Sequence, residues 1–114
     1  MNNEEQSAET APTNVLTDVA DLIKRGAEHA RWQQFEEAEN LYREATILAR
    51  RELGADHQVY GYALSDLAAL QEQSGKPIEA RDNFVAALSI LERHLGNAHP
   101  DTLHIFGRLH HLFR

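Results

Sequence analysis

The chain has 114 residues, of which 42% are hydrophobic and 25% are charged, and this composition is that of a single soluble globular domain. Its net charge of −7, from 18 acidic and 11 basic residues, argues against binding to nucleic acids or acidic lipid surfaces, because both rely on cationic contacts. The chain has no cysteine, which excludes disulfides, thiolate metal sites and thiol nucleophiles.

Residues 1–14, MNNEEQSAETAPTN, are polar and acidic and show no periodic apolar pattern. We expect this segment to be a disordered tail that keeps the protein in solution. It lacks the charged and then apolar pattern of a secretion signal, and no apolar run approaches the ~20 residues of a membrane span. These features predict a cytoplasmic protein.

Beyond the tail, residues 15–114 form the predicted domain, in which apolar residues recur at helical spacing and no segment alternates with a period of two. The pattern predicts an all-α fold of about five helices within residues 19–30, 35–53, 60–71, 78–95 and 103–113. Gly75 followed by Pro77 is typical of a helix that ends at a glycine and another that begins at a proline.

The chain repeats itself at an interval of 42 residues. Shifting the sequence by this interval places Ala38 on Ala80, Tyr42 on Phe84, Ala45 on Ala87, Gly54 on Gly96 and His57 on His99. A period of roughly 20–50 residues built from two helices is typical of an α-solenoid, in which each helical hairpin covers the apolar face of its neighbour. The alanines then allow the helices to approach closely, and the aromatic residue fills the space between them.

These positions carry a family resemblance. The order small residue, alanine, aromatic residue, alanine occurs twice, at Gly26, Ala38, Tyr42 and Ala45 and at Ala68, Ala80, Phe84 and Ala87. It resembles the tetratricopeptide repeat, and LYREATILARRELGADHQ and FVAALSILERHLGNAHPDT are similar to the kinesin-light-chain type with its longer second helix. The resemblance implies repeats near residues 18–56 and 58–98 and a terminal helix near residues 101–113. Gln33 departs from it, standing where a turn glycine is usual.

No catalytic or metal-binding pattern is present. Five of the seven histidines lie between residues 94 and 111, but His104 and His111 are two helical turns, about 10 Å, apart and cannot converge on one metal ion. The sequence has no glycine-rich phosphate loop and no plausible Ser/His/Asp arrangement. We therefore expect no enzyme activity, no cofactor and no metal. His57 and His99 recur in equivalent loops, which suggests that they bond to helix ends, and Trp32 is expected to pack inside the first repeat.

The resemblance implies a concave groove, lined by the first helix of each pair, that receives an extended or helical peptide. Carried over by position, the groove comprises Tyr62, Ser65, Asp66, Ala69, Glu72, Gln73, His104, Arg108 and His111, with Ile23 and Ala27 from the first helix. Tyr62 and Arg108 are residue types that contribute strongly at interfaces. The alternative is that these are ordinary solvent-facing side chains. The basic residues with which some family members hold a peptide carboxylate are absent, since Ala27, Ser65, Ala69 and Glu72 stand in the groove instead.

Two functions follow from this pattern. The first is a non-catalytic adaptor that binds a peptide or protein partner through the concave groove. The second is a structural subunit of a homo-oligomer or larger assembly, because two and a half repeats fall short of the ~3 that solenoids generally need. Its contact would be an apolar edge on the last helix, formed by Phe106, Leu109 and Phe113. The sequence names neither the partner nor the oligomeric state.

Overall fold

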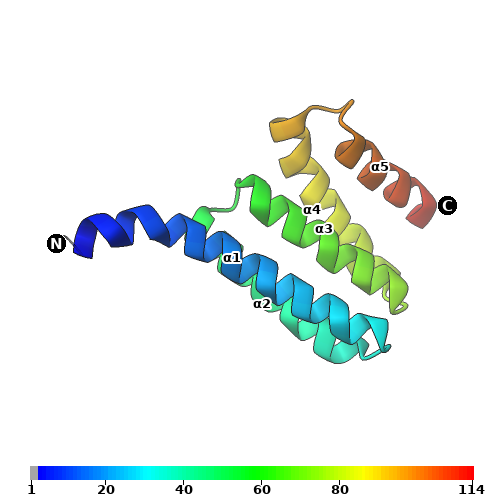
Figure 1. Ribbon diagram of the computed structural model, residues 1–114. Coiled ribbons are helices and arrows are strands. Elements are labelled where there is room, and N and C mark those ends of the chain that lie inside the picture. The colour runs from blue at the N-terminus through cyan, green and yellow to red at the C-terminus, as the bar shows by residue number, and fades with distance from the viewer. Residues whose placement is uncertain (1–2) are drawn as a thin grey trace.

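The computed structural model describes the backbone of residues 3–114 and the side chains of residues 14–114. Five helices follow one another along the chain: α1 (Asn3–Arg31), α2 (Phe35–Leu53), α3 (Gln58–Gln73), α4 (Pro77–Leu95) and α5 (Pro100–Leu112). Helices α1 and α2 form one antiparallel hairpin, α3 and α4 form a second beside it, and α5 packs on α4 (Figure 1). The described residues contain no strand, so the all-α prediction of two hairpins and a terminal helix is confirmed.

Helix α1 begins much earlier than the sequence indicated. Its backbone is helical from Asn3, whereas residues 1–14 were expected to form a disordered tail; Met1, Asn2 and the side chains of residues 3–13 lie outside the described part of the chain. The expected break at residue 14 is therefore not a break in secondary structure. Extending a packed helix adds one hydrogen bond per residue without a new nucleation step, and alanine and glutamate are good helix formers.

Small residues allow the helices of each hairpin to pack closely. Ala38 and Ala80 are fully buried, and the aromatic rings of Tyr42 and Phe84 are buried beside them. A Cβ added at Gly26 would lie 2.4 Å from the Tyr42 ring, which is too close for two carbon atoms. The sequence repeat therefore records a packing requirement: the small residue on the first helix makes room for the aromatic residue on the second.

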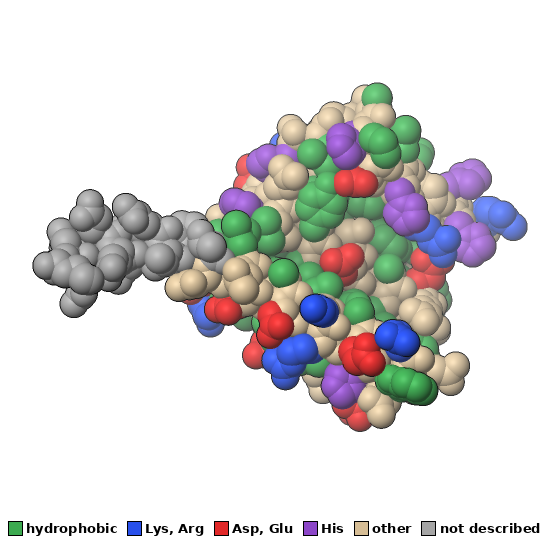
Figure 2. Space-filling view, viewed as in Figure 1, with side chains coloured by type: hydrophobic (Ala, Val, Ile, Leu, Met, Phe, Trp, Pro, Cys, Tyr) green, Lys and Arg blue, Asp and Glu red, His purple; other side chains and the backbone are tan. Residues whose placement is uncertain are grey.

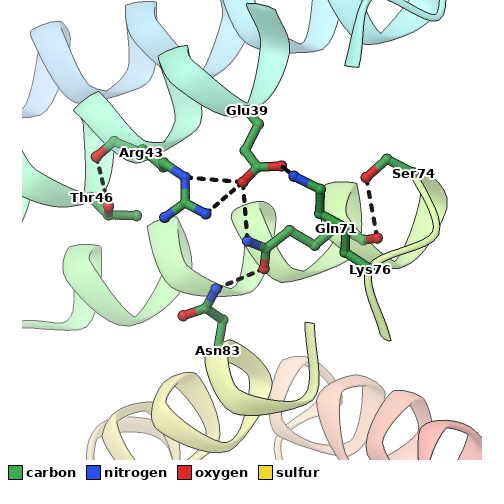
Figure 3. Close-up of polar contacts among 7 residues, drawn as sticks. All are labelled: Glu39, Arg43, Thr46, Gln71, Ser74, Lys76 and Asn83. Carbon is green, nitrogen blue, oxygen red and sulfur yellow. Dashed lines mark hydrogen bonds and ion pairs between the residues drawn. The ribbon is translucent and has the colours of Figure 1, made fainter. Parts of the chain in front are cut away.

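A buried polar network joins the two hairpins (Figure 3). Glu39 of α2 accepts hydrogen bonds from Lys76 Nζ at 2.9 Å and from Arg43 Nε at 3.0 Å. Gln71 of α3 lies between the hairpins, where its amide nitrogen donates to Glu39 at 3.5 Å and its oxygen accepts from Asn83 of α4 at 2.7 Å. Burial alone would raise the pKa of Glu39, but its bonds to Lys76, Arg43 and Gln71 lower that pKa overall. The network thus provides hydrogen-bonding partners for the Glu39 carboxylate, which is buried between the two hairpins.

The loops confirm the predicted role of two histidines. His57 Nδ1 accepts a hydrogen bond from the Val59 amide at 3.0 Å, and His99 Nδ1 accepts one from the Asp101 amide at 3.0 Å. Each histidine therefore caps the helix that follows it by satisfying an amide without a helical partner. In the turn between α1 and α2, Gln33 has a positive φ of 60°, a conformation that favours glycine.

Trp32 does not pack inside the first repeat, so that prediction is wrong. Its side chain is 69% exposed at the end of α1, where the ring nitrogen donates to Glu28 at 3.3 Å. Ala30 and Phe35, and not Trp32, pack against the buried residues at this end of the hairpin. Among the described residues, none of the helices has the length and apolar character needed to cross a membrane.

Candidate functional site

The first helices of the hairpins, α1 and α3, lie with α5 on the face that Figures 1 and 2 present to the viewer. Two hollows lie between α3 and α5. One, of about 490 Å³, is lined by Ala69, Glu72, Gln73, His104 and Arg108. The other, of about 210 Å³, is lined by Tyr62, Ser65, Asp66, Ala69, Phe84, Asp101, His104 and Ile105. Because Ala69 and His104 belong to both, the hollows form one groove, which we call the α3–α5 groove.

Eight of the predicted groove residues line this groove, and three do not. Ile23 of α1 is half-buried and packs against the hydrophobic core, while Ala27 and His111 are exposed but line neither hollow. The difference arises because position within a repeat predicts which face of a helix a residue occupies, but not how far along the helix the hollow extends. The groove lies mainly between α3 and α5.

The charged side chains at the rim are held by partners within the chain. The Tyr62 hydroxyl donates to the Asp101 carboxylate, and this bond raises the pKa of Tyr62 to about 12. Arg108 binds Glu72 through two hydrogen bonds, of which the one from Nε to Oε1 is 3.0 Å long. Both pairs join α3 to α5 and fix the width of the groove.

Asp101 was missed by the sequence analysis. It lies three residues before His104 and so shares a side of α5 with it, which is the signal that could have found it. The buried side chains of Phe84 and Ile105 form the floor of the smaller hollow; the sequence analysis predicted Phe84 only as a packing residue and did not single out Ile105. A residue at the floor of the hollow belongs both to the core and to the groove, and helical periodicity predicts only its place in the core.

Asp66 differs from the other acidic groups of the groove. Among the described residues its carboxylate has no hydrogen bond and no ion pair, whereas Asp101 and Glu72 each have a partner. Its side chain reaches solvent, but the surrounding protein displaces part of the water around the carboxylate, and this partial burial raises the pKa of Asp66 to about 6. The Asp66 charge in turn helps raise the pKa of Tyr42, after the larger effect of the burial of that tyrosine.

Comparison with known families identifies the architecture. The family model described as tetratricopeptide repeat matches residues 23–93, more than half of the chain. The chain belongs to the tetratricopeptide repeat family. No curated protein matches it. Tetratricopeptide repeats are a non-catalytic family whose members generally act as protein-interaction modules. The finer resemblance to the kinesin-light-chain type stays a prediction.

The last helix of this tetratricopeptide repeat domain leaves one face open. Phe106 and Phe113 are 61% and 63% exposed, and they border a hollow of about 340 Å³ together with Leu109 and His110. Leu109 was predicted to belong to the exposed edge, but it is buried and contributes only the floor of the hollow, because it faces the core shared with α4. The guanidinium of Arg81 lies 5.6 Å from the centroid of the Phe113 ring. We call this surface the α5 end face.

The histidines of the domain have separate surroundings. Across residues 14–114, no three side chains of His, Asp or Glu come together as a metal site would require. His94 Nε2 lies 2.6 Å from the Asp56 carbonyl oxygen, and it links the end of α4 to the loop that follows α2. His29 Nδ1 lies 2.7 Å from Gln34 Oε1, so together with the caps at His57 and His99 four of the seven histidines have partners within the domain.

Proposed function

We propose that this tetratricopeptide repeat domain binds an extended or helical segment of a protein partner along the α3–α5 groove. The observation that carries the proposal is that two hollows join into one groove along two first helices, with polar side chains at its rim. The rim is held by the Tyr62–Asp101 and Arg108–Glu72 pairs, so the groove has a fixed shape before a partner arrives. A fixed shape lowers the entropic cost of binding.

The test is a comparison of double variants in affinity capture from the native host. We expect Tyr62→Ala with Arg108→Ala to lose the captured partner, because it removes the two side chains best suited to anchor one. The control is Ile47→Ala with Arg50→Ala, which changes two exposed residues of α2. Circular dichroism must show that both variants remain folded. If the groove variant captures the same proteins as the control, the groove is not the binding surface.

A second candidate function is assembly with another copy of the chain through the α5 end face. It is favoured by a comparison within the molecule: Leu64 and Ala68, 42 residues before Phe106 and His110, are buried where α3 packs on α4. On α5 the equivalent face is uncovered, although it carries two exposed phenylalanines. A second helix packed there would bury an apolar surface that now meets water.

Gly107 is the helical glycine of α5. A glycine inside a helix costs about 1 kcal/mol relative to alanine. The other two helical glycines, Gly26 and Gly61, each lie against a neighbouring helix, since an added Cβ would meet Tyr42 at 2.4 Å or Ile90 at 3.0 Å. At Gly107, beside Phe106, an added Cβ would meet nothing within 4 Å. No described helix therefore packs against Gly107.

Light scattering across a range of protein concentrations tests this second function. We expect the chain to self-associate and the variant Phe106→Ser with Phe113→Ser to be monomeric, because it removes the apolar contact. The control, Ile78→Ser with Val85→Ser, changes exposed apolar residues of α4 and should leave the association unchanged. A stable monomer at high concentration would rule out assembly between copies through this face.

A further inference from the structure

The smaller hollow of the α3–α5 groove has the dimensions of a pocket for one side chain. Its volume is about 210 Å³, below the roughly 300–1,000 Å³ of pockets that hold small-molecule ligands. Phe84 and Ile105 provide an apolar floor, while Tyr62, Asp66 and His104 bring polar atoms to its wall. An apolar floor and a polar wall suit a side chain that has an aliphatic stem and a polar end.

Asp66 is the one acidic group of this hollow that accepts no hydrogen bond from another described side chain. The Asp101 carboxylate accepts a hydrogen bond from Tyr62, and in the adjoining larger hollow Arg108 pairs with Glu72. Residues at the positions equivalent to Asp66 in the neighbouring repeats are basic, Lys24 and Arg108, yet neither forms an ion pair with it. The pocket therefore presents a carboxylate that no cationic side chain of the described residues pairs with.

The surroundings of the Asp66 carboxylate make a bound cation favourable. Burial in the groove raises the pKa of Asp66 to about 6, because protein atoms replace part of its hydration and no donor compensates. A positive charge within hydrogen-bond distance would supply that compensation. A negatively charged group in the same place would face Asp66 and Asp101 together, and like charges repel.

We propose that the Asp66 pocket receives the charged end of a lysine or arginine side chain from the partner segment bound along the groove. This inference rests on the proposed function and specifies the chemistry of the partner. The aliphatic stem of the side chain lies over Phe84 and Ile105, and its nitrogen bonds the Asp66 carboxylate. The Tyr62 ring at the pocket wall adds a cation–π surface. The α3–α5 groove thus selects a cationic segment, in accord with its own excess of acidic over basic groups.

Selection from a random peptide library displayed on phage, with the full chain as bait, tests the proposal. We expect the enriched peptides to share a lysine or arginine at one recurring position. The best peptide is then synthesised with a fluorescent label, and its affinity is compared with that of the same peptide carrying glutamine at that position. The affinity should fall at least tenfold, which corresponds to the loss of a charge-assisted hydrogen bond in a partly dehydrated pocket.

Variants of the chain complete the test. Asp66→Asn should lower the affinity for the lysine or arginine peptide by the same factor as the change to glutamine in the peptide. It should leave the affinity for the glutamine peptide unchanged, so that the two changes are not additive. The matched control is Asp82→Asn, the same chemical change at an exposed site on α4, which should alter neither affinity.

Three results would overturn the inference, and they are distinguishable. Peptides that bind without a recurring cation, but lose affinity in Tyr62→Ala with Arg108→Ala, refute the pocket and leave the groove intact. A cation preference that survives Asp66→Asn also refutes the pocket. A selection that enriches no peptide, or peptides unaffected by the groove variant, counts against the inference and the groove function together.

Discussion

The same face of a helix occurs twice in this molecule, once covered and once open. On α3 it is formed by Leu64, Leu67, Ala68 and Gln71, all buried where α3 packs against α2 and α4. On α5 the residues 42 positions later are Phe106, Leu109, His110 and Phe113, of which only Leu109 is buried. At three of the four positions the residue on the open face is larger than the one on the covered face, and the fourth position is leucine in both.

The difference extends to the residues of the second helices that face these positions. Glu39 of α2 bonds the buried Gln71 and anchors the polar network between the hairpins. At the equivalent positions, Arg81 of α4 lies over the ring of Phe113. The buried Glu39 carboxylate is held by several partners, while the half-exposed Arg81 lies on an aromatic ring and has one ion pair, with the exposed Asp82 at 3.6 Å. Equivalent positions of the two repeats therefore share the same backbone geometry, while their residue types differ between the covered and the open helix face.

The largest expected effect distinguishes the two faces directly. Leu64→Ala should destabilise the fold by about 3 kcal/mol, because it leaves a cavity in a core closed by α4. Phe106→Ala, at the equivalent position on α5, should cost less than about 0.5 kcal/mol because its side chain is already in water. Urea denaturation at low protein concentration measures both values. Equal losses would show that the α5 end face is covered in solution.

The second prediction concerns the buried carboxylate. Glu39→Gln should cost about 1–2 kcal/mol at pH 7, because Lys76 and Arg43 lose their anionic partner. Arg81→Gln, the matched change at the open end, should cost about 0.5 kcal/mol or less.

The pH dependence of this loss has a definite sign. The folded-state pKa of Glu39 is lowered, so the stability it contributes is present above the unfolded pKa and is lost as pH falls through the folded value. The difference between the natural chain and Glu39→Gln should therefore shrink below about pH 4.5. Urea denaturation from pH 7 to pH 3 checks this. A difference that does not change with pH would mean that the network does not depend on the carboxylate charge.

A third, smaller effect compares the turns of the two hairpins. Gln33 and Gly75 occupy equivalent positions, and both have positive φ, 60° and 84°. Gln33→Gly should stabilise the fold by about 0.5–1 kcal/mol, since glycine adopts this conformation without strain. Gly75→Gln should destabilise it by a similar amount, and thermal denaturation measures both. A loss of stability in Gln33→Gly would show that the glutamine side chain contributes more than its backbone strain costs.

Much of the fold could be predicted from the sequence because helix packing restricts the residue types at regularly spaced positions. The 42-residue interval, the alanines at 38 and 80 and the histidine caps at 57 and 99 all recur for geometric reasons, and the structure confirms them. The start of α1 was not predictable in the same way, because the sequence of residues 1–14 has no periodic apolar pattern. Trp32 was misplaced because an aromatic residue at a helix end packs inward or outward with the same local sequence.

The groove could be predicted only in part. Position within the repeat identified Tyr62, Asp66 and Arg108 as groove residues, since equivalent positions share a helix face. The pairs Tyr62–Asp101 and Arg108–Glu72 were not predictable, because they depend on how far α5 is displaced along α3. Whether Asp66 has a partner depends on the same displacement. Charge pairing across a solenoid is therefore a property of the stacked helices that a single repeat does not contain.

The smallest expected effect on stability concerns Asp66 and contrasts with Glu39. Its folded-state pKa is raised by burial, so its contribution to stability is present below the unfolded pKa of 3.8 and is lost as pH rises through about 6. Asp66→Asn should therefore be more stable than the natural chain at pH 8, by less than about 1 kcal/mol because the carboxylate retains much of its hydration. The gain should disappear near pH 4, while Asp82→Asn should show no gain at either pH. A loss of stability in Asp66→Asn at pH 8 would mean that Asp66 supports the fold. A gain there would mean that the groove keeps a carboxylate at the expense of stability, as a binding residue commonly does.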